Sequence, residues 1–183
     1  MREFEKMIAG EAYNPADKEL LNLRIEARTT FEEYNKTSVI DINKRKELLT
    51  KLFGKELEGV YIEPNFKCDY GINIYAGKNL YINFDCVILD VAKVIIGDNC
   101  FIAPQVGIYT ATHPINSDER NKGLGYGKQV TIGNNCWIGG HAVINPGVTL
   151  GDNVVVGAGA VVTKSFGSNV VIAGNPARVI KNI

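Results

Sequence analysis

His113 is the residue of this sequence whose type and setting best suit proton transfer. It lies in the phrase YTATHPIN at the start of a polar, Gly-rich stretch, and Pro114 biases its backbone toward an extended conformation. The unperturbed pKa of histidine, ~6.5, suits proton removal near neutral pH. Taken alone, a histidine in such a stretch is more often an ordinary surface residue, so residue type leaves both interpretations open.

Other polar residues stand where a ligand could be bound, and each has an ordinary structural explanation. Asn83, in NLYINFDC, follows an aliphatic residue, a place where asparagine commonly serves a turn. Asp90 closes the overlapping phrase YINFDCVILD, and Asp69 and Tyr70 adjoin in KCDYG. Arg24 belongs to a predicted helix, where a charged side chain is usually only solvated. Residue type alone decides none of these roles.

A repeat with a period of six must position these residues. Between Val130 and Lys164 an aliphatic residue occupies every sixth position, and a small or polar residue follows each one. This period fits neither an α-helix nor a lone strand, but it fits a short strand plus a turn. Three such units make a coil of roughly 18 residues that stacks on the next at ~4.8 Å, which predicts a parallel β-helix. The inward aliphatic positions are Ile132, Ile138, Ile144, Leu150, Val156 and Val162.

The repeat extends over most of the chain. It begins near Tyr61 and slips by two residues near Asp90, which predicts a small bulge in the coil wall. Residues 113–129 break the pattern with a polar, Gly-rich stretch, which we interpret as a loop extruded from a rigid scaffold. Residues 167–183 are expected to cap the open end, as a solenoid requires.

The N-terminal part is predicted to be helical. Apolar spacing indicates helices over residues 2–12 and 15–36, and a third that Asp41 caps and Gly54 ends. Short helices with one apolar face need a partner surface, and the flank of the β-helix is the nearest. We therefore divide the chain into a helical segment, 1–58, and a β-helix domain, 59–183.

Several phrases resemble those of a known family. The [ILV]-G-x4 form, with IGDN, WIGG, INPGVTLGDNVVVGAGAVVTK and GNPAR, resembles the hexapeptide-repeat acyltransferases, and within them the maltose and galactoside O-acetyltransferases. The resemblance covers essentially the whole chain. It implies a mainly β fold, a left-handed parallel β-helix, with acetyl-CoA as co-substrate and a sugar as acceptor. It also implies a homotrimer with active sites between neighbouring subunits.

The resemblance also assigns roles. His113, in the ATHP phrase before the same loop, matches the general base, and Asn83, in YINFDCVILD, matches the residue that holds the reacting hydroxyl. Positions matching the acceptor side are Asp69, Tyr70, Asp90 and Arg24, and positions matching coenzyme A contacts are Gly140, Ala158, Thr163, Lys164, Arg178 and Lys181. Asp69 stands where the galactoside enzymes have a serine, which leaves the exact sugar open, and the phrase YIEPNFKCDYG is nearer that of the maltose enzymes.

These roles imply transfer of acetyl from acetyl-CoA to a sugar hydroxyl by direct attack, with His113 as base. A xenobiotic acceptor such as an antibiotic is one alternative, which the helical N-terminal block disfavours because it marks the sugar subgroup. A non-catalytic binding protein is the other, since a fold does not prove a function. An acyl-cysteine route is disfavoured because Cys86, Cys100 and Cys136 are predicted to point inward; Cys68 stays open.

Composition narrows the partners. Lys plus Arg number 20 and Asp plus Glu number 20, so nothing favours nucleic acid or a membrane surface. The N-terminus is charged where a signal peptide is apolar, and we expect a cytoplasmic protein. His113 and His141 are the only two histidines, one fewer than the hexapeptide carbonic anhydrases use for their metal, so we expect no metal.

Overall fold

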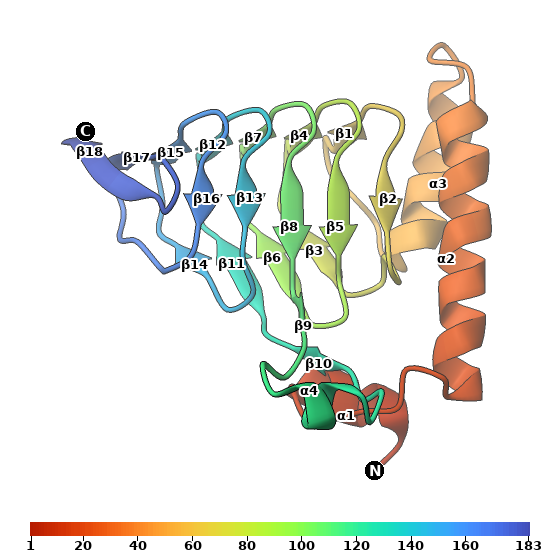
Figure 1. The fold of residues 1–183 in the computed structure, drawn as a ribbon. Helices are drawn as coiled ribbons and strands as arrows, with labels where there is room; N and C mark the ends of the chain where they lie inside the picture. Colours follow the sequence, from red (N-terminus) through yellow and green to blue (C-terminus); the bar gives the residue numbers. More distant parts are fainter.

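The computed structural model describes all 183 residues, and the chain folds as the predicted parallel β-helix (Figure 1). Successive short strands fall in turn on three sheets that form the walls of a column. The seven-stranded sheet contains β1 (Tyr61–Ile62), β4 (Tyr81–Ile82), β7 (Phe101–Ile102), β12 (Trp137–Ile138), β15 (Val154–Val156), β17 (Val170–Ala173) and β18 (Arg178–Asn182).

The other two walls are shorter. The five-stranded sheet contains β2 (Lys67–Cys68), β5 (Val87–Leu89), β8 (Gly107–Tyr109), β13 (Val143–Ile144) and β16 (Val161–Val162). The four-stranded sheet contains β3 (Ile74–Ala76), β6 (Val94–Ile96), β11 (Val130–Ile132) and β14 (Thr149–Leu150).

The register of the strands stacks side chains of the same kind on one another inside the column. Ile82 pairs with Ile102 and Ile102 with Ile138, all in parallel register, and each is at most 1% exposed. Burial of such a side chain contributes roughly 1.5–3 kcal/mol, so the inward rows stabilise every coil through its neighbours. The inward aliphatic residues that the repeat predicted therefore form the core of the fold.

Two rows of turns matter for the site. The Asn83 corner joins the seven-stranded to the five-stranded sheet and consists of residues 63–66, 83–86, 103–106, 139–142 and 157–160. The loop corner joins the five-stranded to the four-stranded sheet and consists of residues 69–73, 90–93, 110–129, 145–148 and 163–165. The two corners therefore lie at opposite ends of the strands of one sheet.

Helices α2 (Lys18–Lys36) and α3 (Ile42–Phe53) close one end of the column, and their apolar residues join its core. Helix α1 (Glu3–Ala9) lies beside one edge of the column, near α4 (Ser117–Arg120) of the extruded segment (Figure 1). Asp41 caps α3 and Gly54 ends it, as predicted. Helix α1 is shorter than predicted because Gly10 ends it in the left-handed conformation, with φ 76°. Helix α2 begins at Lys18, later than predicted, because the Asp17 side chain accepts the Glu19 and Leu20 N–H groups.

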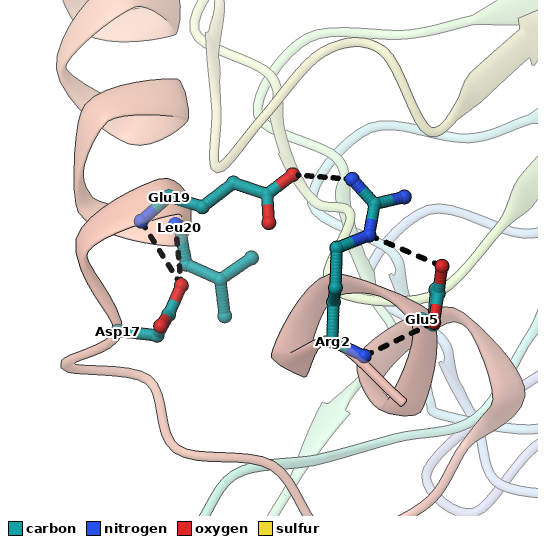
Figure 2. A network of polar contacts seen from close by, with 5 residues as sticks. All are labelled: Arg2, Glu5, Asp17, Glu19 and Leu20. Atoms are coloured by element: carbon teal, nitrogen blue, oxygen red, sulfur yellow. Dashed lines mark hydrogen bonds and ion pairs between the residues drawn. The ribbon is translucent and has the colours of Figure 1, made fainter.

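Polar contacts join these helices to one another and to the column. Arg2, the N-cap residue of α1, donates to Glu5 in that helix at 3.1 Å and to Glu19 at the start of α2 at 3.3 Å (Figure 2). Farther along α2, the Asn35 side chain donates to Phe66 O at 2.8 Å and accepts from Phe66 N at 3.0 Å. Helix α2 is thereby fastened to the first coil, while the β17–β18 hairpin closes the other end (Figure 1).

Candidate active site

Asp90 organises the loop corner at the point where the repeat slips. Its Oδ1 accepts the backbone N–H groups of Asp69 and Tyr70, each at 2.9 Å, and Asn73 donates to its carbonyl at 2.7 Å. Asp90 has no exposed area, and burial raises the pKa of its carboxyl to about 7. The predicted bulge is therefore a hydrogen-bonded corner.

The prediction that Asp90 contacts the acceptor directly does not fit this burial. A side chain with no exposed area does not reach a ligand on the surface. What Asp90 does in the structure is hold the backbone N–H groups of Asp69 and Tyr70. Asp90 thus fixes the backbone conformation at Asp69 and Tyr70.

Thr110 extends this polar support to the extruded segment. Its hydroxyl donates to Leu89 O at 2.6 Å and accepts from Ala92 N at 2.9 Å, and its side chain is fully buried. Because Thr110 is the last residue before β9 (Ala111–Thr112), the segment leaves the column from a fixed base.

The extruded segment is a two-stranded ribbon that the N-terminal part clamps. Strand β9 pairs antiparallel with β10 (Tyr126–Gly127), and Tyr13 forms a bridge with Gly125 next to it. Ala111 packs on a small apolar cluster of Met7, Tyr13, Leu20, Tyr70 and Val91. Figure 1 shows the ribbon, α4 and α1 gathered beside one edge of the column.

His113 directly follows β9, the first strand of this ribbon. Its side chain is exposed, and it makes no hydrogen bond within the chain. Arg120 donates to the carbonyls of Pro114 and Ile115 at 3.0 and 2.9 Å, which keeps the turn after His113 compact. The imidazole is therefore free to meet a ligand while its backbone is held on both sides.

Acceptor-side candidates gather near the same ribbon. Arg24, half-buried on α2, donates to Tyr70 Oη at 3.3 Å and to Pro15 O at 2.6 Å, and its guanidinium lies 5.9 Å from the Tyr70 ring centre. The half-buried Asp69 carboxylate forms no hydrogen bond within the chain, and burial raises its pKa although Arg24 and Arg28 oppose the shift. Burial likewise raises the pKa of Tyr70. This corner offers a free carboxylate beside a guanidinium.

Asn83 lies at the other corner. Its backbone N–H donates to Ile102 O at 2.8 Å, and its Oδ1 accepts from Phe84 N at 2.8 Å, which leaves the side-chain NH₂ without a partner in the chain. Gly140 and Ala158 occupy the same corner on later coils, and Arg178 pairs with Ala173 where β17 reaches that edge. Lys181 lies farther along β18, opposite Val171.

The candidate residues thus form two groups at opposite ends of the five-stranded sheet. Strand β5 and its flanking turns separate Asn83 from Asp90, and His113 directly follows β9, which leaves the column at the Asp90 end of this sheet. The loop-corner group contains Arg24, Asp69, Tyr70, Asp90, His113, Thr163 and Lys164. The Asn83-corner group contains Asn83, Gly140, Ala158 and Arg178. One chain does not bring His113 and Asn83 together.

The structure shows neither an exposed cysteine nor a group of side chains placed as metal ligands. All four cysteines are free and buried, and burial raises the pKa of the Cys68 thiol well above its usual value. Cys68, which the repeat pattern left open, is therefore a poor nucleophile. No group of three or more His, Cys, Asp or Glu side chains is arranged to hold a metal. No helix has the length and apolar character to cross a membrane.

Comparison with known proteins agrees with this architecture. The family model of the maltose acetyltransferase hexapeptide capping motif matches residues 6–56, and that of the hexapeptide repeat of succinyl-transferase matches residues 129–164. Galactoside O-acetyltransferase of Escherichia coli is 42% identical over 179 residues, covering 98% of this chain and 88% of its own length. The chain belongs to the maltose and galactoside O-acetyltransferase family.

Solved relatives in this family have nearly the same fold. A maltose O-acetyltransferase from Clostridium difficile superposes with a TM-score of 0.98 at 48% identity, covering 100% of this chain and 98% of its own. A galactoside acetyltransferase in complex with coenzyme A gives 0.95 at 42% identity, covering 100% and 92%. A Vibrio cholerae hexapeptide-repeat acetyltransferase complexed with acetyl-CoA gives 0.93 at 35%, covering 100% and 98%. Acetyl-CoA is the co-substrate that the family implies.

Sequence reasoning missed the residues that hold this site in place. Tyr13 clamps the ribbon, and buried Asn73 and Thr110 complete the polar support around Asp90. The one signal in the sequence was the slip of the repeat near Asp90, which marked an irregular corner without showing its hydrogen bonds.

Proposed function

We propose that this acetyltransferase transfers the acetyl group of acetyl-CoA to a hydroxyl of a sugar, in an active site that two copies of the chain build together. The observation that carries the proposal is the separation of His113 and Asn83 to opposite ends of the five-stranded sheet. If both act on one acceptor, the second must come from a neighbouring copy.

A threefold ring satisfies this requirement. When the five-stranded sheet of each copy faces the axis, the Asn83 corner of one copy meets the loop corner of the next, three times over, in a closed C3 arrangement. The outward side of this sheet is suited to such contact, because its half-buried residues are mainly apolar. They are Val87, Leu89, Tyr109, Val143 and Val161.

In the proposed site His113 is the general base. Its exposed imidazole takes the proton from the acceptor hydroxyl, while the free amide NH₂ of Asn83 from the adjoining copy orients that hydroxyl. Acetyl-CoA supplies a thioester that the deprotonated oxygen attacks. His113 then returns the proton to the departing sulfur, so the imidazole ends the cycle as it began.

The acceptor side suits a neutral polyhydroxyl compound. The free Asp69 carboxylate accepts hydrogen bonds from ligand hydroxyls, and Arg24 donates to ligand oxygens while Tyr70 holds it in place. Asp90 acts indirectly, by fixing the backbone of Asp69 and Tyr70. Hydrogen bonding of a sugar by carboxylate and guanidinium groups is the simplest use of this corner.

The donor side has room for the long arm of coenzyme A. A Cβ added at Gly159 would meet no atom within 4 Å, and one at Gly140 would meet only Pro104 O at 3.3 Å and Ala103 Cβ at 4.0 Å. The surface along the Asn83 corner is therefore open for close approach of a ligand to the backbone. Arg178 and Lys181 are exposed near the end of the column on this side, where they would meet the phosphates of the donor, and the exposed Lys164 would reach the same phosphates from the loop corner of the adjoining copy.

A coenzyme A release assay tests the proposal. Acetyl-CoA is offered with mono- and disaccharides, with antibiotics, and with water alone, and we expect release only with sugars. His113→Ala should lower turnover by roughly 10²–10⁴-fold while acetyl-CoA still binds, and Lys122→Ala, an exposed change in the same loop, should not. Release with antibiotics alone, or undiminished turnover of His113→Ala, would refute it.

A further inference from the structure

A cavity lies away from the candidate active site, between α3 and the first coil of the column. Its volume is about 250 Å³, slightly below the ~300 Å³ at which pockets for drug-sized ligands begin, so it has room only for a small ligand. Its walls are mainly apolar, and two cations from α3 line it. The residues that matter here are Tyr34, Arg45, Lys46, Leu49, Val60 and Tyr61.

Arg45 is buried in the wall of this cavity, with 3% of its surface exposed. Its guanidinium donates to Thr37 Oγ1 at 3.2 Å and to Tyr34 Oη and Ile62 O, both at 2.7 Å. The Nε–H is buried and has no acceptor. The guanidinium carbon lies 4.4 Å from the Tyr34 ring centre and 5.4 Å from that of Tyr61.

No acid neutralises this charge. None of the six ion pairs of the chain includes Arg45 or Lys46. Glu63, whose charge acts on Tyr34, accepts a hydrogen bond from Tyr81 Oη at 3.2 Å instead. An uncompensated buried charge is destabilising, and neutral oxygens and aromatic faces offset only part of its lost hydration.

We propose that this cavity binds a small amphipathic carboxylate. Its carboxylate lies against Arg45 and Lys46, and its apolar body lies against Leu49, Val60 and Tyr61. Such a ligand supplies both what the guanidinium lacks, a negative acceptor, and what fills the apolar walls. Tyr34 of this cavity and Arg24 of the acceptor side stand ten residues apart on α2, ~15 Å along the helix, so the two sites are separate.

Binding of benzoate and hexanoate, with benzamide and hexanol as neutral analogues, tests this inference. With ¹⁵N-labelled protein we expect saturable shifts at the Gly59 and Val60 amides for the carboxylates, at least tenfold weaker binding of the neutral analogues, and no shift at Gly125. Acceptor sugar should not displace the carboxylate. This independence keeps the test separate from that of the proposed function.

Charge variants locate the site. Lys46→Glu, an exposed change, should weaken benzoate binding at least fivefold, whereas Lys51→Glu, the same change elsewhere on α3, should leave it unchanged. Arg45→Met should abolish binding if circular dichroism shows it folded, and Lys46→Glu decides the matter if it does not fold. Equal binding of acid and amide, no saturable shift, or insensitivity to Lys46→Glu would overturn the proposal.

Discussion

Tyr13 and Gly125 exchange two backbone hydrogen bonds, from Tyr13 N to Gly125 O at 3.1 Å and from Gly125 N to Tyr13 O at 2.8 Å. This bridge ties the segment between α1 and α2 to the extruded ribbon. Through the ribbon it restrains the backbone that leads to His113, far away in sequence. Placement of the proposed base therefore depends on the N-terminal segment.

The substitution Gly125→Ala should disturb this placement. Its Cβ would lie 2.5 Å from Tyr13 Cζ, so the Tyr13 ring or the ribbon must move. A shift of about 1 Å in a catalytic group costs up to ~10²-fold in turnover, and we expect a loss of that order with the KM for acetyl-CoA unchanged. Steady-state kinetics measure both.

The matched control is Gly167→Ala, where an added Cβ meets no atom within 4 Å. Its kinetics and melting temperature should equal those of the wild type, and circular dichroism should show that Gly125→Ala is folded at the assay temperature. Full turnover of Gly125→Ala would show that the bridge does not position His113.

Asp90 should make the protein less stable as the pH rises. Its folded pKa, about 7, lies above the usual ~3.9, so the folded state binds an extra proton between these values. The stability this provides is present at low pH and is lost as the pH rises through 7. From pH 5 to pH 8 the free energy of unfolding should fall by up to about 2–3 kcal/mol, and Asp90→Asn should remove most of that slope.

Urea unfolding of both proteins across this range provides the measurement. Glu3 and Glu5, whose pKa values are lowered, are ionised in both states above pH 5 and do not obscure the slope. The same pH dependence in wild type and Asp90→Asn would contradict the assignment.

Asp69→Asn should affect the acceptor and not the donor. The carboxylate has no partner within the chain, so its hydrogen bonds are available to a ligand. Loss of a hydrogen bond to a charged group costs about 1.5–3 kcal/mol, which corresponds to a rise of roughly 10–150-fold in acceptor KM. The KM for acetyl-CoA should stay within twofold, as both constants should in Asp118→Asn, an exposed loop carboxylate. A rise confined to acetyl-CoA would place Asp69 on the donor side.

The period-six pattern was enough to predict the fold, because each inward aliphatic residue repeats one local environment. Asp41 and Gly54 marked the ends of α3 because caps act within a single turn. The burial of Asp90 could not be predicted from the sequence, because its partners Asp69 and Tyr70 lie about one coil away and no local pattern shows that the side chain is buried. Tyr13 was missed since its bridge to Gly125 depends on the path of the whole ribbon.

The split site also predicts which wall lies at the proposed threefold axis. Val143, half-buried on the outward side of the five-stranded sheet, should face the axis, so Val143→Lys should yield monomers in sedimentation velocity and abolish turnover. Thr131→Lys, at the equivalent outward place in the four-stranded sheet, should keep the assembly and the activity. A trimeric, active Val143→Lys protein would place the interface elsewhere.

Mixing two inactive variants tests the shared site most directly. His113→Ala and Asn83→Ala proteins, unfolded together in equal amounts and refolded, should form mixed rings. A site is active only when its His113 comes from an Asn83→Ala chain and its Asn83 comes from a His113→Ala chain. Each condition holds for half of the sites, so about a quarter of the wild-type specific activity should return. Activity that stays at the level of the separate variants would contradict a site built by two copies.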